Sequence, residues 1–436
     1  MPPIKMKLRT LSPIHIGNGN KIEPFEYITI GSKYYRINLD TCFDYIFSNV
    51  EGSLDKFNRW IEESAYNMGQ NPNQAVANFQ FDIFGFIRNK LNNNNLINDI
   101  KNKLVNDPAF RRYSLENHYQ LNGRQVSELI KTANNELYIP GSSIKGMLRN
   151  VLMNYTIRNM NDKNIISRMI NNDRGDRKWF GKKVEEYIFN CGYLKKGKPN
   201  YQDAKYDLMK FIQVSDTNTI SCEKGGRIVN PQLYKNNGEV QPQVPFIEAI
   251  KENIELEFRI SIDFQAIRAL AKKFSTISKN QRREWLYFES KIKELFGVEI
   301  QSIQNDEVVL KKILKILVDS IEDFSAGIIY KEQEWADKNQ RQGNAAQKMM
   351  HFYKSLPENA IKLGWASGFP GITVFDALTS EENDIEQYIK QNYISSLRRF
   401  NIIQNKNVDE FPLSHRFETF SNTKINPIGW VSIEKE

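Results

Sequence analysis

The stretch NIELEFRISIDF, residues 253–264, alternates apolar and polar side chains without a break. Successive side chains of a strand point to opposite faces of a sheet, so this pattern predicts a strand with one buried face. FQAIRALAKKF, residues 264–274, switches at once to helical spacing. A chain that contains this pair of patterns has to build a sheet that helices cover, which favours the α+β class.

Further strands are expected near the amino terminus. Ile4, Met6 and Leu8 alternate with cations and predict a half-buried strand. The runs FEYITI and KYYRINL are joined by Gly31-Ser32, which predicts a tight hairpin. A closing strand is expected in PIGWVSI, residues 427–433.

The chain has 436 residues, which is more than one compact domain usually needs. Prolines before the alternating strand place a domain boundary near residue 245. We expect an N-terminal domain over 1–245 with a mostly helical insertion over about 41–135 and a basic, turn-rich segment over about 160–210. A C-terminal domain with its own helical insertion is expected over 246–436.

The net charge points to a polyanionic partner. Lys and Arg number 60 against 52 Asp and Glu, a formal charge of +8. Residues 145–210 alone contain 15 Lys or Arg against seven Asp or Glu. This segment is either a solvated surface or a surface that faces a polyanion such as nucleic acid.

Cysteines and apolar runs indicate a soluble protein. The three cysteines are widely spaced and form no CxxC pair, which argues against a disulfide framework. The first residues lack the apolar stretch of a signal peptide, and no apolar run is long enough to span a bilayer. We therefore expect a cytoplasmic protein that uses no membrane.

LYIPGSSIKGMLRNVL, residues 137–152, places small residues before a helical pattern. Ser142 or Ser143 is expected to cap a helix that runs from about residue 144 to 158. The free N–H groups of such a helix start bind anions. This arrangement suits a phosphate of a nucleic-acid backbone.

The same motif supplies two cations and two glycines. Lys145 and Arg149 are four residues apart and share one helix face. Gly141 and Gly146 allow another backbone to approach closely. They have the separation of a P-loop, but the Lys-Ser/Thr pair of that motif does not follow. The alternative is an ordinary capped helix with two solvated cations.

Catalytic signals are sparse. None of the four histidines belongs to an HExxH motif, and no His/Cys cluster suggests zinc, so neither a metal nor a cofactor is expected. His15 lies in the glycine-rich loop SPIHIGNGN, where it is either a general base for RNA cleavage or a structural hydrogen-bonding residue. We assign no catalytic residue.

A second glycine-rich loop, IKLGWASGFPG, covers residues 361–371 and contains Trp365. An aromatic side chain in a loop near cations suits single-stranded RNA, whose bases stack while its phosphates are neutralised. The residues alone therefore predict a binder of polyanions.

Three motifs resemble those of the CRISPR-associated RAMP superfamily. They are LSPIHIGNGNKIEPFEYI, YIPGSSIKGMLRNVL and LGWASGFPGITVF, in the order of the family. Together with PIGWVSI they look most like the crRNA 3′-end subunit of the type III-A (Csm) interference complex. The resemblance does not cover residues 41–135 or 160–210.

The resemblance implies two ferredoxin-like, RRM-related domains with glycine-rich loops and large helical insertions. It implies that the RNA-contacting residues are His15, Gly17, Gly19, Gly141, Ser142, Ser143, Lys145, Gly146, Arg149, Gly364, Ser367 and Gly368.

The resemblance also implies a non-catalytic protein that binds crRNA, caps its 3′ end and supports crRNA maturation in antiviral defence. Its implied partners are the repeated RAMP backbone subunit, the small helical subunit and a recruited processing nuclease. Two alternatives remain: a metal-independent crRNA-processing endoribonuclease with His15 as base, and a subunit of the related type III-B Cmr complex.

Overall fold

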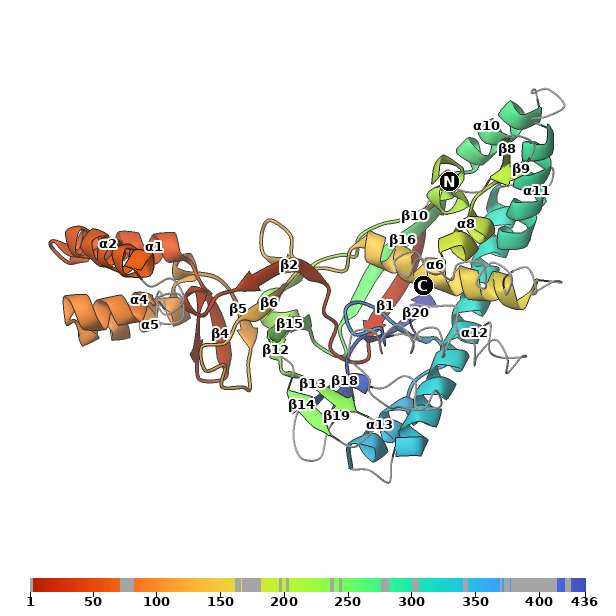
Figure 1. The fold of residues 1–436 in the computed structure, drawn as a ribbon. Helices are drawn as coiled ribbons and strands as arrows, with labels where there is room; N and C mark the ends of the chain where they lie inside the picture. Colours follow the sequence, from red (N-terminus) through yellow and green to blue (C-terminus); the bar gives the residue numbers. More distant parts are fainter. Residues whose placement is uncertain are drawn as a thin grey trace.

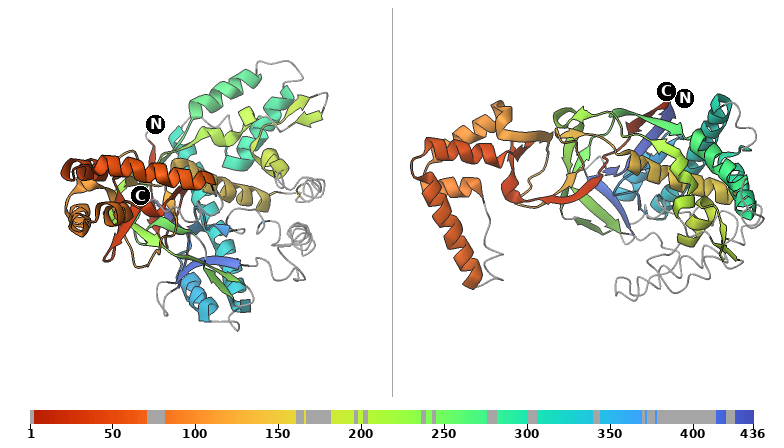
Figure 2. Two further views of the ribbon diagram at one scale, coloured as in Figure 1. Left: turned by 60° about the vertical axis from the view of Figure 1, so that its left-hand side comes forward. Right: turned by 90° about the horizontal axis from the view of Figure 1, so that it is seen from above.

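The computed structural model describes most of the chain. The described residues are 3–70, 82–160, 166, 182–195, 198–200, 204–235, 239–242, 245–275, 282–299, 306–339, 344–368, 371, 377, 414–419 and 425–436. Residues 6–10 and 431–435, close to the two chain ends, pair side by side within a central sheet, while a helical lobe and a group of longer helices lie at opposite ends of the molecule (Figures 1 and 2).

A five-stranded antiparallel sheet contains the strands that the alternation predicts. Its order is β10 (Ile212–Val214), β16 (Glu255–Ile262), β1 (Ile4–Thr10), β20 (Trp430–Lys435) and β17 (Ala360–Lys362). Met6 lies opposite Phe258, and Leu8 lies opposite both Leu256 and Ile433. The predictions of a half-buried first strand, an alternating strand near residue 258 and a closing strand are confirmed.

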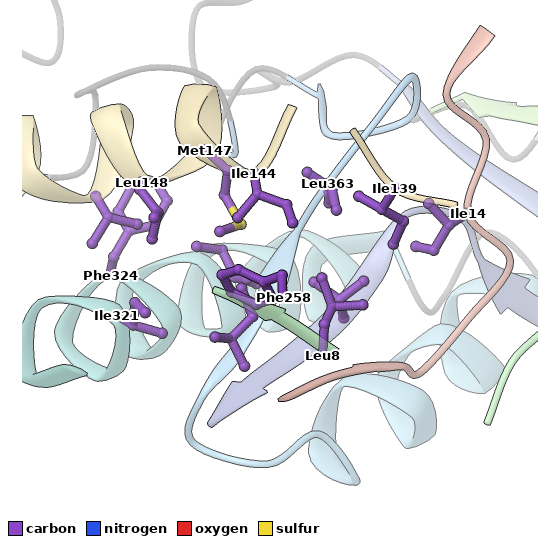
Figure 3. Close-up of a cluster of buried hydrophobic side chains, with 14 of the residues drawn as sticks. Leu8, Ile14, Ile139, Ile144, Met147, Leu148, Phe258, Ile321, Phe324 and Leu363 are labelled. Carbon is purple, nitrogen blue, oxygen red and sulfur yellow. The ribbon is translucent and has the colours of Figure 1, made fainter. Parts of the chain in front are cut away.

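Two long helices cover this sheet. They are α6 (Gly141–Arg158), which lies between β1 and β10 along the chain, and α12 (Asp306–Asn339), which lies between β16 and β20. Figure 3 shows Met147 and Leu148 of α6 and Phe324 of α12 in one cluster with Leu8 and Phe258 of the sheet. Burial of such apolar side chains is the main favourable contribution to folding.

A mixed seven-stranded sheet lies beside the first. Its order is β2 (Gly17–Ile22), β6 (Val126–Leu129), β15 (Phe246–Ile250), β12 (Gly226–Val229), β5 (Arg111–Glu116), β4 (Lys33–Ile37) and β3 (Tyr27–Ile30). The predicted hairpin is confirmed as β3 and β4, with Ile30 opposite Lys33. The segment 41–135, expected to be a mostly helical insertion, also contains the two strands β5 and β6 of this sheet.

The helical part of that insertion forms a lobe with its own core. It contains α1 (Leu39–Asn49), α2 (Ser53–Gln70), α4 (Ile83–Phe86) and α5 (Asn94–Asn106). Ile46, Phe86 and Ile100 are fully buried there, and Phe57 and Trp60 of α2 pack against them. The lobe lies at the left end of the molecule in Figure 1.

The remaining elements are shorter or peripheral. A four-stranded sheet has the order β14 (Val240–Pro242), β13 (Pro231–Lys235), β18 (Ser414–Thr419) and β19 (Ile425–Pro427), and two strand pairs are β7 (Glu136–Leu137) with β11 (Ile220–Ser221) and β8 (Tyr193–Lys195) with β9 (Lys198–Asn200). The further helices are α8 (Lys182–Phe189), α9 (Cys222–Gly225), α10 (Phe264–Ser275), α11 (Arg282–Phe296) and α13 (Asn344–Lys354). The short helical turns are η1 (Pro24–Glu26), η2 (Ile87–Leu91), η3 (Pro108–Phe110), η5 (Ala204–Tyr206) and η6 (Leu208–Phe211).

Both large sheets take strands from either side of residue 245. Strand β1 pairs with β16 and β20, and β12 pairs with β15. The predicted boundary therefore separates strands that are hydrogen-bonded to one another, and the division into two domains stays a prediction. Within the described ranges, no helix combines the length and apolarity needed to cross a membrane.

Candidate nucleic-acid interface

The three glycine-containing motifs meet in space although they are far apart in sequence. Figure 3 shows Ile14 of the first motif, Ile139 and Ile144 of the second and Leu363 of the third in neighbouring positions of one buried cluster. The first and third motifs also bond directly, since the backbone N–H of Trp365 donates to the carbonyl of His15 at 2.9 Å. One fold thus brings all three loops to the same region.

The second motif begins its helix earlier than the sequence predicts. Helix α6 starts at Gly141 with Pro140 as its N-cap, and no side chain caps it from that position. The prediction that Ser142 or Ser143 caps the helix is therefore wrong. The carbonyl of Pro140 accepts the N–H of Ile144 at 3.2 Å, and proline favours a helix start because its backbone angle is already fixed.

A carboxylate of the protein itself occupies the helix start. Asp216 Oδ1 accepts the N–H of Gly141 at 2.7 Å. This contact satisfies one of the free donors that the sequence assigns to an external anion, and it places a negative charge there. Ser142 is exposed and Ser143 is half-buried, so both remain accessible beside Asp216.

The two glycines of this motif have different surroundings. A Cβ added at Gly141 would lie 2.4 Å from the carbonyl oxygen of Val214 and 2.6 Å from that of Ser215, so the close backbone is the chain's own. A Cβ added at Gly146 would meet nothing within 4 Å. Only Gly146 therefore leaves open space on the exposed side of α6 for an incoming strand.

The two cations of the motif also differ. Arg149 forms ion pairs with Glu185 and, at 2.8 Å, with Asp207, and its guanidinium lies 4.1 Å from the Phe189 ring centre. This side chain is held by internal partners, so the expectation of two available cations needs correction.

Lys145 stands one helical turn before Arg149 and is half-buried. In the part of the chain that the structure describes, it makes no ion pair. Burial lowers the pKa of its ammonium, Asp207 acts in the opposite direction, and the charge of Arg149 lowers it further. A partly desolvated cation that forms no ion pair with the described residues gains from an incoming phosphate.

His15 is a buried residue with a structural hydrogen bond. Its side chain is 5 % exposed, and Nδ1 lies 2.7 Å from the carbonyl oxygen of Glu248. Burial lowers the pKa of the imidazole and so favours the neutral ring. Gly17 leaves room for this ring, because a Cβ there would lie 3.0 Å from His15 Nε2. Gly19 follows in the left-handed region, at φ 92°.

The conformation of the third loop is set by its own hydrogen bond and by its contact with His15. Gly364 has φ 85°, and a Cβ there would lie 2.5 Å from the His15 carbonyl. Ser367 is buried, and its Oγ donates to the carbonyl of Gly364 at 2.7 Å. Gly368 also has positive φ, at 68°. Gly364 and Ser367 therefore shape the loop, and among its described residues Trp365 is the one exposed to solvent.

Arg416 is a candidate that the sequence reasoning missed. Its guanidinium lies 4.4 Å from the ring centre of Trp365, which is 39 % exposed. Burial lowers the pKa of Arg416. An aromatic ring beside a guanidinium is a platform on which RNA bases stack. No sequence signal links the two residues, because Arg416 comes from β18 and Trp365 from a separate loop.

A second missed feature is the buried carboxylate below the first loop. Glu248 is fully buried, and its side chain accepts from the hydroxyl of Tyr113 at 2.8 Å, from the N–H of Leu129 at 3.0 Å and from the ammonium of Lys131. These bonds fix the strand whose carbonyl holds His15. Among the described residues, no three His, Cys, Asp or Glu side chains are grouped as ligands for a metal ion.

Comparison with known proteins agrees with the three motifs. A family model described as the RAMP superfamily matches residues 7–328. The protein "CRISPR system Cms protein Csm5" of Streptococcus thermophilus is 29% identical over 269 residues, 59% of this chain and 63% of that protein. The protein of the same name in Mycobacterium tuberculosis (strain ATCC 25618 / H37Rv) is 22% identical over 50% of this chain and 55% of its own length. The matches thus span less than two thirds of these relatives.

Two solved structures share the fold. A chain of the cryo-EM structure of a Csm–crRNA–target RNA ternary complex in a type III-A CRISPR-Cas system superposes with a TM-score of 0.63 at 20% identity, covering 99% of this chain and 100% of that one. The crystal structure of T. onnurineus Csm5 gives a TM-score of 0.59 at 18% identity, covering 98% and 99%.

Proposed function

The chain belongs to the RAMP superfamily, and on that premise we propose that it is the crRNA-binding subunit of a type III-A CRISPR Csm complex that caps the crRNA 3′ end. The convergence of the three motifs carries the proposal, because it gathers glycine-lined backbone and Trp365 around one region. The likeness to Csm5 proteins supports the assignment to a Csm complex.

In the proposed RNA contact, three groups of residues have different roles. Lys145 binds a phosphate, Gly146 lets the ribose-phosphate backbone approach α6, and Trp365 with Arg416 stacks a base. Such contacts are tolerant of sequence, as a subunit that holds many different guides requires. His15 and Ser367 then act as positioning residues that fix the shape of the loops.

We further propose that the five-stranded sheet and its two helices form a ferredoxin-like unit. Along the chain the order is β1, α6, β10, β16, α12 and β20, and in the sheet it is β20-β1-β16-β10 with β17 added at the edge. Two strand–helix–strand units joined by an antiparallel pair are the arrangement of that fold. A second ferredoxin-like unit in the rest of the chain stays part of the proposal.

In the assembled complex we expect the repeated RAMP backbone subunit and the small helical subunit as neighbours, with a recruited nuclease for crRNA maturation. Reconstitution with and without this chain tests the assignment. Csm particles that lack it should lose protection of the crRNA 3′ end while the backbone still forms. Incorporation into Cmr particles instead would favour the type III-B alternative.

Lys145→Ala is expected to weaken binding of single-stranded RNA about fivefold to tenfold and to lower the slope of log affinity against log salt by about 0.7, the loss of one phosphate contact. Fluorescence anisotropy over a range of NaCl concentrations measures both. Lys315→Ala, an exposed cation on α12, is the control and should leave both values unchanged. Identical curves for Lys145→Ala and wild type would contradict the proposed phosphate contact.

Arg149→Ala should act on stability instead. Removal of this guanidinium leaves Glu185 and Asp207 without their shared partner, and we expect a loss of about 1–2 kcal/mol. Urea unfolding measures this free energy. Under conditions in which wild type and variant are both folded, Arg149→Ala should weaken RNA binding less than Lys145→Ala does. A larger loss of affinity for Arg149→Ala would show that Arg149 contacts RNA.

We propose that the chain is not a nuclease. Wild-type protein should leave repeat RNA intact, and His15→Ala should lower stability without changing the RNA pattern on a denaturing gel. The buried position of His15 and its bond to the Glu248 carbonyl support this role. Products with a 2′,3′-cyclic phosphate that disappear in His15→Ala would establish the endoribonuclease alternative.

A further inference from the structure

The seven-stranded sheet carries a polar cavity that the proposed interface does not use. Its volume is about 500 Å³, and Asn18, Asn20 and Lys21 of β2 line it together with Arg36 of β4 and Arg112 of β5. Only Leu129 and Ala133 among its lining residues are apolar. A cavity with this lining suits a polar or charged ligand and disfavours an apolar one.

Two of its cations are already neutralised. Arg36 pairs with Glu26 at 2.6 Å, and Lys131 pairs with the buried Glu248 and lies 3.8 Å from Glu128. These pairs fix the wall of the cavity. Neither guanidinium nor ammonium is available there without breaking an internal contact.

The remaining carboxylate is covered by donors. Glu128 Oε2 accepts from Asn18 Nδ2 at 2.9 Å and from Asn20 Nδ2 at 3.5 Å. Burial would raise the pKa of Glu128, but these hydrogen bonds and the charge of Lys131 lower it overall. The carboxylate of Glu128 is therefore engaged by these donors and by Lys131, which reduces its repulsion of an incoming anion.

The other two cations of the cavity are unused. Lys21 and Arg112 are exposed, and neither makes an ion pair with any residue that the structure describes. They come from β2 and β5, strands at different positions in the sheet, and face the same cavity. An exposed lysine and an exposed arginine on the wall of one polar hollow can each hold a phosphate of the same nucleic-acid strand.

We propose that this cavity binds single-stranded RNA, with Lys21 and Arg112 each holding one phosphate of its backbone. The inference rests on the proposed function and extends it. Gly17 and Gly19 of the first motif lie on the same strand as Lys21, so a strand of RNA that leaves the first loop along β2 enters the cavity directly. The RNA path then crosses the seven-stranded sheet toward β5.

The test is the double variant Lys21→Ala/Arg112→Ala with labelled single-stranded RNA. We expect about tenfold weaker binding and a salt slope reduced by up to about 1.4, the value for two phosphate contacts. The double variant Lys56→Ala/Arg59→Ala removes the same charges from exposed positions of α2 and should bind like wild type. The exchange Lys21→Arg/Arg112→Lys keeps both charges and should restore most of the affinity.

Failure of the inference differs from failure of the proposed function. If wild type binds RNA, Lys145→Ala weakens it and the cavity variant binds like wild type, the cavity inference alone is overturned. Unchanged RNA binding together with lost incorporation into the complex would assign the cavity to a protein partner and also overturn it. If wild type does not bind RNA at all, both proposals fall together. Circular dichroism of each variant confirms that it is folded before the comparison.

Discussion

Glu332→Gln is expected to destabilise the folded protein by about 3–5 kcal/mol, because it removes the anion of a buried ion-pair group. Glu332 lies on α12 and is fully buried. Its carboxylate pairs with the ammonium of Lys362 on β17 and, at 2.7 Å, with Nε2 of His415 on β18. The variant would leave the buried Lys362 without a counter-charge. It would also weaken the contact of α12 with the five-stranded sheet, which contains β17, and with the four-stranded sheet, which contains β18.

Urea unfolding at neutral pH measures this loss. Glu334→Gln is the matched control: it lies on the same helix, its side chain is 37% exposed, and it pairs with Lys338 at 2.8 Å on the surface. We expect the control to change stability by less than about 1 kcal/mol. Similar effects of the two substitutions would show that the buried group contributes no more than a surface pair.

The same carboxylate predicts a pH dependence. Burial would raise the pKa of Glu332, but the neighbouring His415 and Lys362 lower it far more. A lowered pKa contributes stability that is present above the usual glutamate value of 4.5 and is lost as the pH falls through the folded-state value. Acidification below 4.5 should therefore narrow the stability difference between wild type and Glu332→Gln, and a constant difference would contradict this assignment.

Gly141→Ala is expected to destabilise the protein by about 3 kcal/mol, while Gly146→Ala should stabilise it by about 0.5–1 kcal/mol. At Gly141 the new methyl group would overlap the carbonyl of Val214, and a backbone group cannot rotate away as a side chain does. At Gly146 there is free space, and alanine is the better helix former. Both substitutions add one methyl group to α6, but we expect opposite changes in the free energy of unfolding.

Thermal unfolding of the two variants tests this contrast directly. Each serves as the other's control, because both lie in α6 and neither changes charge. A destabilised Gly146→Ala would mean that a neighbour already fills that space. A neutral Gly141→Ala would mean that β10 moves away from the helix start at little cost.

Part of the fold could be predicted from sequence because the signals are local. The alternation around Phe258 and Leu8 marks strands that are buried on one face, and Gly31 with Ser32 marks the hairpin of β3 and β4. Strands β5 and β6 were missed because they lack that alternation: the three consecutive residues 113–115 of β5 are all buried. Such strands are recognised only once their neighbours in the sheet are known.

The candidate site was predicted in outline for the same reason. Its glycines are visible in the sequence, but the partners that decide their roles come from distant segments. Asp216, which bonds to Gly141, lies 75 residues later, and Asp207 lies 58 residues after Arg149. Sequence spacing therefore identified the loops and left open which of their cations is free.

The position of β1 between β16 and β20 has a consequence for synthesis on the ribosome. Strand β1 obtains one of its two neighbours only when residues 430–435 have been made. Until then the backbone N–H and C=O groups of β1 that bond to β20 are unpaired, and such groups can pair with strands of other chains. Nascent chains of this protein should therefore depend on chaperones, and a stalled chain that lacks β20 should aggregate.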